Sequence, residues 1–131
     1  MIYLADIRDW LKQYKLFEHY YVGKLDSKQE KSLGVYQRKN TATPVRAFSN
    51  ASSYDIKPIS LLIHWNKNST ETEKAAFELY KQLETVSRFM LNDTQIYILT
   101  LLQSEPVDVG TDENGVYERV IEFDIYYERK K

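Results

Sequence analysis

The sequence predicts one α+β domain, built from a mixed, mainly antiparallel sheet of about five strands with two helices packed on one face. Its 131 residues match the length of an ordinary single domain. Two segments repeat apolar residues every three or four positions, which is typical of amphipathic helices, and several others alternate or are almost continuously apolar, as strands are. Because neither internal repeats nor a linker divide the chain, residues 1–131 are expected to form a single domain.

The first third of the chain predicts one helix and two strands. Apolar residues at helical spacing predict a helix over about 3–15: Leu4, Ile7, Leu11 and Tyr14. Alternation then predicts a strand over 16–24, and the segment 32–38 predicts a second one. Since the residues between them, 25–31, are charged and turn-like, we expect the two strands to form a hairpin.

The middle of the chain combines a long irregular stretch with a buried strand. Residues 39–57 show no apolar period and are rich in Asn, Thr, Ser and Ala. A stretch of this length without secondary structure is usually a functional or a disordered loop. Pro58 then precedes a strongly apolar segment over 59–65. Because both of its faces carry apolar residues, we expect this strand to be covered on both sides.

A second helix is predicted over about 70–90. Thr70 and Glu73 resemble a capping box at its start. Its apolar residues form one stripe: Ala76, Leu79, Leu83, Val86 and Met90. A nearly continuous apolar segment over 94–103 predicts a central strand. Strand, helix and strand in this order fit a right-handed βαβ crossover.

The end of the chain predicts a polar loop and a long last strand. The loop covers 104–115 and turns at Asn114-Gly115, a typical hairpin pair. The strand over 116–128 is apolar on one face and carries a row of acidic residues on the other: Glu118, Glu122, Asp124 and Glu128. Such a row is either an ordinary solvent-facing surface or a wall that repels phosphates, as in a pore through which DNA passes. The residues leave both readings open.

Composition argues against the common kinds of catalytic and metal site. The chain has no cysteine, which excludes disulfides and thiolate chemistry. Its two histidines, His19 and His64, lie in predicted strands without acidic residues at metal-ligand spacing. The four glycines are too scattered for a phosphate-binding loop, and residues 108–115 lack EF-hand spacing. We therefore predict no catalytic residues, no cofactor and no metal.

Charge and hydropathy limit the classes of partner. A net charge of −1 gives no general attraction to nucleic acid. The longest apolar runs, such as 96–102, are too short to span a bilayer, so no membrane partner is expected. Charges at Asp6, Arg8 and Asp9 do not fit a signal peptide, and a cytoplasmic location is expected. The eleven tyrosines fit either half-buried strands or an interface.

The last part of the chain carries a family resemblance. Residues 106–127, PVDVGTDENGVYERVIEFDIYY, resemble the end of small phage tail-terminator proteins, often described as minor capsid proteins. In that family, too, an acidic loop with glycines precedes a long amphipathic strand. The segment 59–65, ISLLIHW, before a long helix is similar as well. The order of elements agrees over most of the chain, and the similarity in sequence covers about 59–127.

The resemblance implies a structural virion protein rather than an enzyme. Members form a ring, usually of six subunits, on the last ring of the tail tube, end tail polymerisation and form the interface for head attachment. The implied partners are further copies of the chain, the tail tube protein and the head–tail connector protein, with DNA only as passing cargo. The implied location is the virion tail, after assembly in the bacterial host cytoplasm.

By analogy with the family, contacts with subunits and tube are expected on two loops. These residues are Pro44, Val45, Arg46, Phe48, Val107, Val109, Asp112 and Glu113. The acidic face of the last strand is expected to look toward the lumen, through Glu118, Glu122 and Asp124. The resemblance transfers no catalytic residue.

Three other functions stay open. A head–tail connector or completion protein also forms rings, and docking to the portal rather than to the tail tube distinguishes it. A ligand- or protein-binding α+β module is expected to stay monomeric and to show a well-formed apolar pocket. An enzyme is expected to use His64 with a nearby carboxylate, in a cleft where a pKa is strongly shifted.

Overall fold

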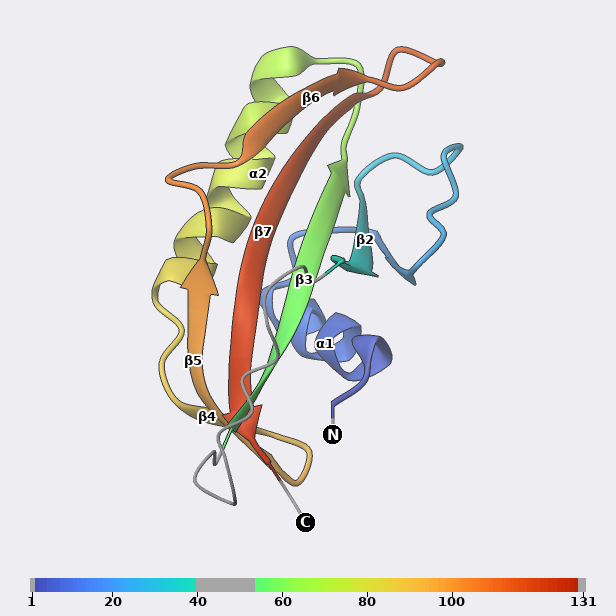
Figure 1. The fold of residues 1–131 in the computed structure, drawn as a ribbon. Coiled ribbons are helices and arrows are strands. Elements are labelled where there is room, and N and C mark those ends of the chain that lie inside the picture. Colours follow the sequence, from blue (N-terminus) through green and yellow to red (C-terminus); the bar gives the residue numbers. More distant parts are fainter. Residues whose placement is uncertain (1, 40–53, 130–131) are drawn as a thin grey trace.

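The computed structural model describes residues 2–39 and 54–129. One seven-stranded sheet carries both helices on the same face (Figure 1). The helices are α1 (Leu4–Leu11), continued by a short 3₁₀ turn η1 (Lys12–Tyr14), and α2 (Ser69–Glu84). The strands are β1 (His19–Val22), β2 (Ser32–Gln37), β3 (Tyr54–His64), β4 (Phe89–Leu91), β5 (Thr94–Leu101), β6 (Val107–Thr111) and β7 (Tyr117–Glu128). The predicted fold class is confirmed, with seven strands where about five were expected.

The two longest strands, β3 and β7, form the centre of the sheet. They pair antiparallel from Tyr54–Glu128 to His64–Glu118. The strand order is β1-β2-β3-β7-β5-β4, and β6 pairs with β7 beyond the end of β5, on the same side. The strand predicted over 59–65 therefore begins earlier, at Tyr54, while residues 40–53 of the predicted long loop lie outside the described residues.

The apolar sides of helices and strands meet in one core on the helix-bearing face. Opposed residues of β3 and β7, such as Leu61 and Ile121, are fully buried there. The helices contribute Ile7, Leu11, Ala76, Leu79 and Leu83. Leu62 and Val120 point to the other face and are only half-buried in the described part of the chain. The helices thus cover one side of β3, and residues 23–31 cover part of the other at the fully buried His64, where coverage on both sides was expected.

The predicted hairpin of the first two strands is wrong, because β1 and β2 run parallel. Residues 23–31 do not turn tightly; they cross the open face of the sheet, where the Ser27 carbonyl oxygen lies 3.0 Å from Nε2 of His64. Gly34 allows this close approach, since a Cβ there would lie 3.3 Å from the Leu25 side chain and 2.7 Å from the Tyr36 ring. The chain therefore returns to the same end of the sheet before β2 begins.

The second helix is shorter than predicted and begins differently. Asn68, not Thr70, caps it by accepting a hydrogen bond from the Glu71 backbone N–H at 3.0 Å. The helix ends at Glu84, and residues 86–88 lead into β4, which pairs with β5. The apolar stripe predicted for this helix runs on into β4 without a break in its spacing. Spacing alone therefore did not show where the helix ends. Met90 is accordingly 57% exposed.

The crossover from β3 through α2 to β5 joins two strands that run parallel, since both are antiparallel to β7. They are not neighbours, because β7 lies between them. The polar segment 104–115 contains β6, which was expected to be loop, followed by the predicted turn. Gly115 has the left-handed φ of +81° that this turn requires. The turn projects from the end of the sheet (Figure 1).

Candidate assembly surfaces

The β6 strand is an exposed edge strand. All five of its residues are exposed, including two apolar ones, Val107 at 39% and Val109 at 49%. It pairs with β7 on one side, and no described strand covers its other side. Its pairing with β7 shifts register between Asp108 and Thr111, where Gly110 has a φ of +86° and its N–H donates to the Asp108 carboxylate at 2.8 Å. An exposed edge with apolar side chains is a template for adding another chain.

The turn after β6 is held by Asp112. Its Oδ1 accepts hydrogen bonds from the backbone N–H groups of Asn114 and Val116, both at 2.9 Å. Its other oxygen, Oδ2, lies 3.8 Å from Nδ1 of His64. Glu113, by contrast, is exposed at the tip. Of the two acidic residues expected at an interface here, Asp112 shapes the turn and Glu113 is free to contact a partner.

The acidic row on β7 lies on the face opposite the helices, and each of its members is engaged by a donor or histidine. Glu118 lies 2.8 Å from Nδ1 of His64. Glu122 accepts a hydrogen bond from the Gln103 amide at 2.9 Å, and Asp124 accepts one from the Arg38 guanidinium at 2.7 Å. These partners come from other strands and loops, so sequence spacing could not reveal them. The row carries less uncompensated negative charge than the sequence suggested.

His64 is fully buried, although it points to the open face of the sheet. Residues 23–31 and the β6–β7 turn close over it, through the contacts with Ser27 and Asp112. The carboxylates that an enzyme would pair with this histidine are present, but the ring has no exposed surface at which to meet a substrate. Within 2–39 and 54–129, no cluster of three or more His, Asp or Glu residues could hold a metal ion.

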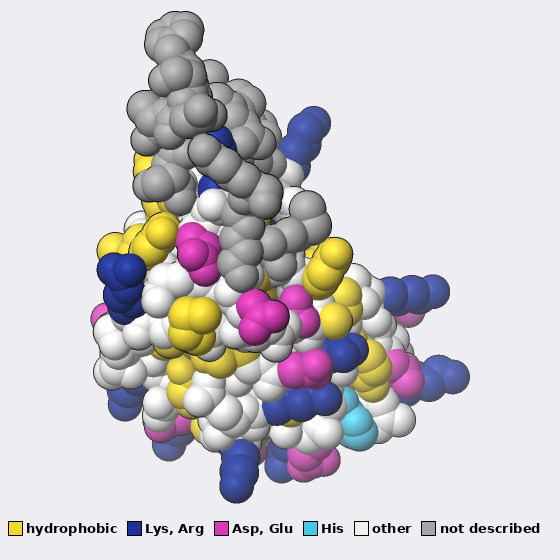
Figure 2. Space-filling view, turned by 90° about the horizontal axis from the view of Figure 1, so that it is seen from below, with side chains coloured by type: hydrophobic (Ala, Val, Ile, Leu, Met, Phe, Trp, Pro, Cys, Tyr) yellow, Lys and Arg dark blue, Asp and Glu magenta, His cyan; other side chains and the backbone are white. Residues whose placement is uncertain are grey.

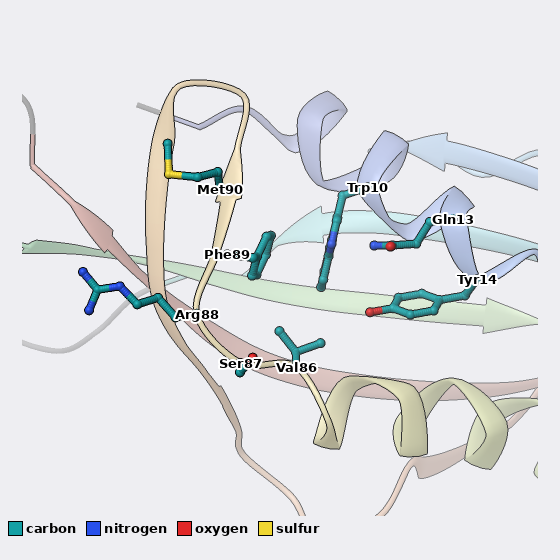
Figure 3. A pocket seen from close by; sticks show the side chains of 8 residues that line it. All are labelled: Trp10, Gln13, Tyr14, Val86, Ser87, Arg88, Phe89 and Met90. Carbon is teal, nitrogen blue, oxygen red and sulfur yellow. The ribbon is translucent and has the colours of Figure 1, made fainter.

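A cleft of about 350 Å³ lies between α1 with η1 and residues 86–90, which lead into β4 and begin it. The Trp10 and Phe89 rings are part of its lining and stack on each other, with centroids 4.8 Å apart and planes 13° apart. Figure 3 shows these two rings side by side, with Arg88 and Met90 pointing away from the stack. Arg88 instead lies over the Tyr97 ring at 5.0 Å. This stacking contact joins α1 to β4 at the wall of the cleft.

The end of the molecule where β4 turns into β5 has a mixed surface. Acidic, basic and hydrophobic side chains alternate over the visible part of this face (Figure 2). Tyr3 and Met90, at 62% and 57%, are the most exposed large hydrophobic side chains of the described residues. Neither positive nor negative charge dominates the visible part of this face.

A comparison with known protein families distinguishes a tail terminator from a head–tail connector. A family model described as bacteriophage tail terminator protein matches residues 3–129. The chain belongs to this family. The match includes every helix and strand of the fold, and it confirms the resemblance found in the sequence. No curated protein matches the chain.

Membership makes this tail terminator a component of the virion tail, in a family that is structural. Among the described residues, no helix is long and apolar enough to cross a membrane. Of the expected contact residues, Pro44, Val45, Arg46 and Phe48 lie outside the described residues. The others gather on β6 and its turn, while Glu118, Glu122 and Asp124 lie on the open face of β7.

Proposed function

We propose that copies of this tail terminator close into a ring of six on the last ring of the tail tube. The ring ends polymerisation of the tube and presents its opposite surface to the head–tail connector, and DNA passes through it as cargo. Assembly takes place in the cytoplasm of the bacterial host. Membership in the tail-terminator family over residues 3–129 is the observation that carries this proposal.

The exposed edge of the sheet and the low net charge of the chain support assembly into such a ring. A ring built from one kind of subunit needs two different surfaces that fit each other. The exposed β6 edge offers Val107 and Val109 to a neighbour, and Glu113 stands at the projecting tip. A net charge of −1 lets copies approach without strong mutual repulsion.

The open face of β7 is proposed to line the channel. Glu118, Glu122 and Asp124 lie there: Glu118 contacts His64, and the other two accept hydrogen bonds from Gln103 and Arg38. An acidic wall repels the phosphates of DNA, and the internal hydrogen bonds hold its carboxylates in place. Such a surface suits a polymer that must slide past it.

Light scattering across a concentration series tests the ring. The proposal expects one discrete species near six times the subunit mass, either alone or after addition of tail tubes. Val109→Lys is expected to weaken that species, because a charged edge opposes pairing. Met90→Lys, which makes the same change at an exposed residue on β4, serves as control. A protein that stays monomeric alone and ignores tail tubes contradicts the proposal.

A further inference from the structure

We propose that the free edge of β6 in one copy pairs with the free edge of β1 in the next, so that the sheet continues from copy to copy around the ring. This inference rests on the proposed ring and names the two surfaces that close it. The partner is a second copy of this chain, and the contact is heterologous, since the two edges differ.

Both edges are unpaired in the described structure, and they bound opposite sides of one band of strands. β1 pairs only with β2, and β6 pairs only with β7. At this end of the sheet the order is therefore β1-β2-β3-β7-β6. A head-to-tail contact between copies needs two such surfaces on opposite sides of the subunit.

The two edges lie at the same level along the strands. One row of paired residues crosses the whole band: Tyr21, Gly34, Leu62, Val120 and Val107. Joining edges at the same level turns one copy relative to the next with little rise along the strands. A contact that rotates without rising closes into a ring, whereas one that rises builds a filament.

The strand directions also suit pairing. β1 runs parallel to β2, and each further step across the band to β3, β7 and β6 reverses direction. Within one copy, β1 and β6 therefore run in opposite directions. Copies related by rotation about an axis along the strands keep those directions, so β6 meets the neighbouring β1 antiparallel. Antiparallel pairing is the more stable arrangement per residue.

Shape and charge of the two edges are complementary. A groove of about 340 Å³, lined by Tyr21, Lys24, Leu25, Asp26 and Ser27, lies beside β1. Tyr21 and Val107 point to the same face of the band, so the groove can receive the exposed valines of β6. Segment 104–113 has four acidic residues and no basic one, and segment 15–31 has four lysines against three acidic residues. Their charges are therefore −4 and +1, opposite in sign.

Cysteine cross-linking tests the contact, because the chain has no cysteine of its own. One variant carries Val107→Cys with Tyr21→Cys, and a control carries Val107→Cys with Lys81→Cys on the exposed surface of α2. Rings are treated with a bifunctional maleimide that joins neighbouring positions of paired strands, up to about 8 Å apart. This reach tolerates a shift of two residues in register. The proposal expects a ladder of covalent multimers up to the ring size from the first variant only.

The outcomes separate this contact from the ring itself. Rings in light scattering without a ladder, or with equal ladders from both variants, overturn the β6–β1 contact but not the ring. Absence of rings, both in solution and on tail tubes, overturns both.

Val107→Lys provides a second test that needs no cysteine at Tyr21. It is expected to raise the concentration needed for assembly about ten-fold, while the melting curve of the subunit is unchanged, because the side chain is exposed. Assembly at the same concentration as the parent contradicts the proposal.

Discussion

Nδ1 of His64 lies 2.8 Å from Oε2 of Glu118, on the face of β3 and β7 that residues 23–31 cross. On the other side of the ring, Nε2 lies 3.0 Å from the carbonyl oxygen of Ser27. Because a carbonyl only accepts hydrogen bonds, Nε2 carries a hydrogen and donates it. The other ring nitrogen, Nδ1, is the one that faces the Glu118 carboxyl group. The pair ties the two central strands to the segment that crosses the open face.

Replacing Glu118 tests this contact with His64. Glu118→Ala is expected to lower the free energy of unfolding by about 2–3 kcal/mol, since it leaves a buried ring nitrogen without a partner. Glu118→Gln supplies an amide donor for Nδ1 and is expected to cost only about 1 kcal/mol. Urea denaturation measures both values. Equal losses from the two variants mean that the hydrogen bond does not stabilise the fold.

The stacked pair of Trp10 and Phe89 is expected to hold α1 against β4. Phe89→Ala removes the stacking and part of the buried surface, and should lower the free energy of unfolding by about 2 kcal/mol. Phe89→Leu keeps much of the apolar contact and should cost less. Urea denaturation in a Trp65→Phe background, followed by the fluorescence of Trp10, measures these effects. Unchanged Trp10 fluorescence in the folded Phe89→Ala protein argues against the stack.

Alkaline pH is expected to destabilise the fold through the buried Tyr80 and the half-buried Tyr14 and Tyr36. Burial raises the pKa of Tyr14, Tyr36 and Tyr80 above the ordinary value of 10.0. The unfolded chain therefore loses these protons first, so their stabilising effect is complete below pH 10.0 and is lost as the pH rises through the folded-state pKa values. Unfolding followed from pH 8 to 11 by circular dichroism measures this decline.

Tyr80→Phe separates one of these tyrosines from the others. Its hydroxyl group donates to the Gln103 carbonyl oxygen at 2.6 Å. The variant should lose about 1 kcal/mol at neutral pH, because the carbonyl loses its donor. It should also show a shallower alkaline decline than the parent protein. The same slope in both proteins contradicts the assignment of Tyr80.

The acidic row of β7 can be tested by reversing its charge. Glu122→Lys with Asp124→Lys places two cations beside Arg38 and Gln103, and is expected to slow passage of DNA if the row lines the channel. Delivery of DNA from assembled virions measures the effect, and Glu78→Lys with Glu84→Lys on α2 controls for net charge. Normal delivery by the first variant, with normal assembly, refutes a channel-lining role.

The fold class followed from periodicity because the core is built from regular stripes. Ile7 and Leu11 on α1, and Leu79 and Leu83 on α2, are buried as their spacing predicts. Periodicity failed where a short strand follows a helix without a break in apolar spacing. Met90 fits the helical stripe of α2, yet pairing with β5 places it on β4. Local sequence carries no signal for a partner strand that comes later in the chain.

Strand direction and the partners of polar residues were also hidden in the sequence. The parallel pairing of β1 with β2 depends on the path of residues 23–31 over Gly34 and His64, which is set by contacts distant in sequence. Asp124 finds Arg38 86 positions away, and Glu118 finds His64 54 positions away. The exposed valines of β6 were expected at an interface through the family resemblance alone. Their place on a free edge strand required the structure.

The measurement that tests the central claim most directly is the growth of tail tubes in the presence of this protein. Purified tube protein of the same phage is polymerised with and without the tail terminator, and tube lengths and ends are measured by electron microscopy. The account predicts that tubes stop growing when the protein is present at one ring per tube end, and that each stopped end carries a ring. Tubes that reach the same length with bare ends would contradict it.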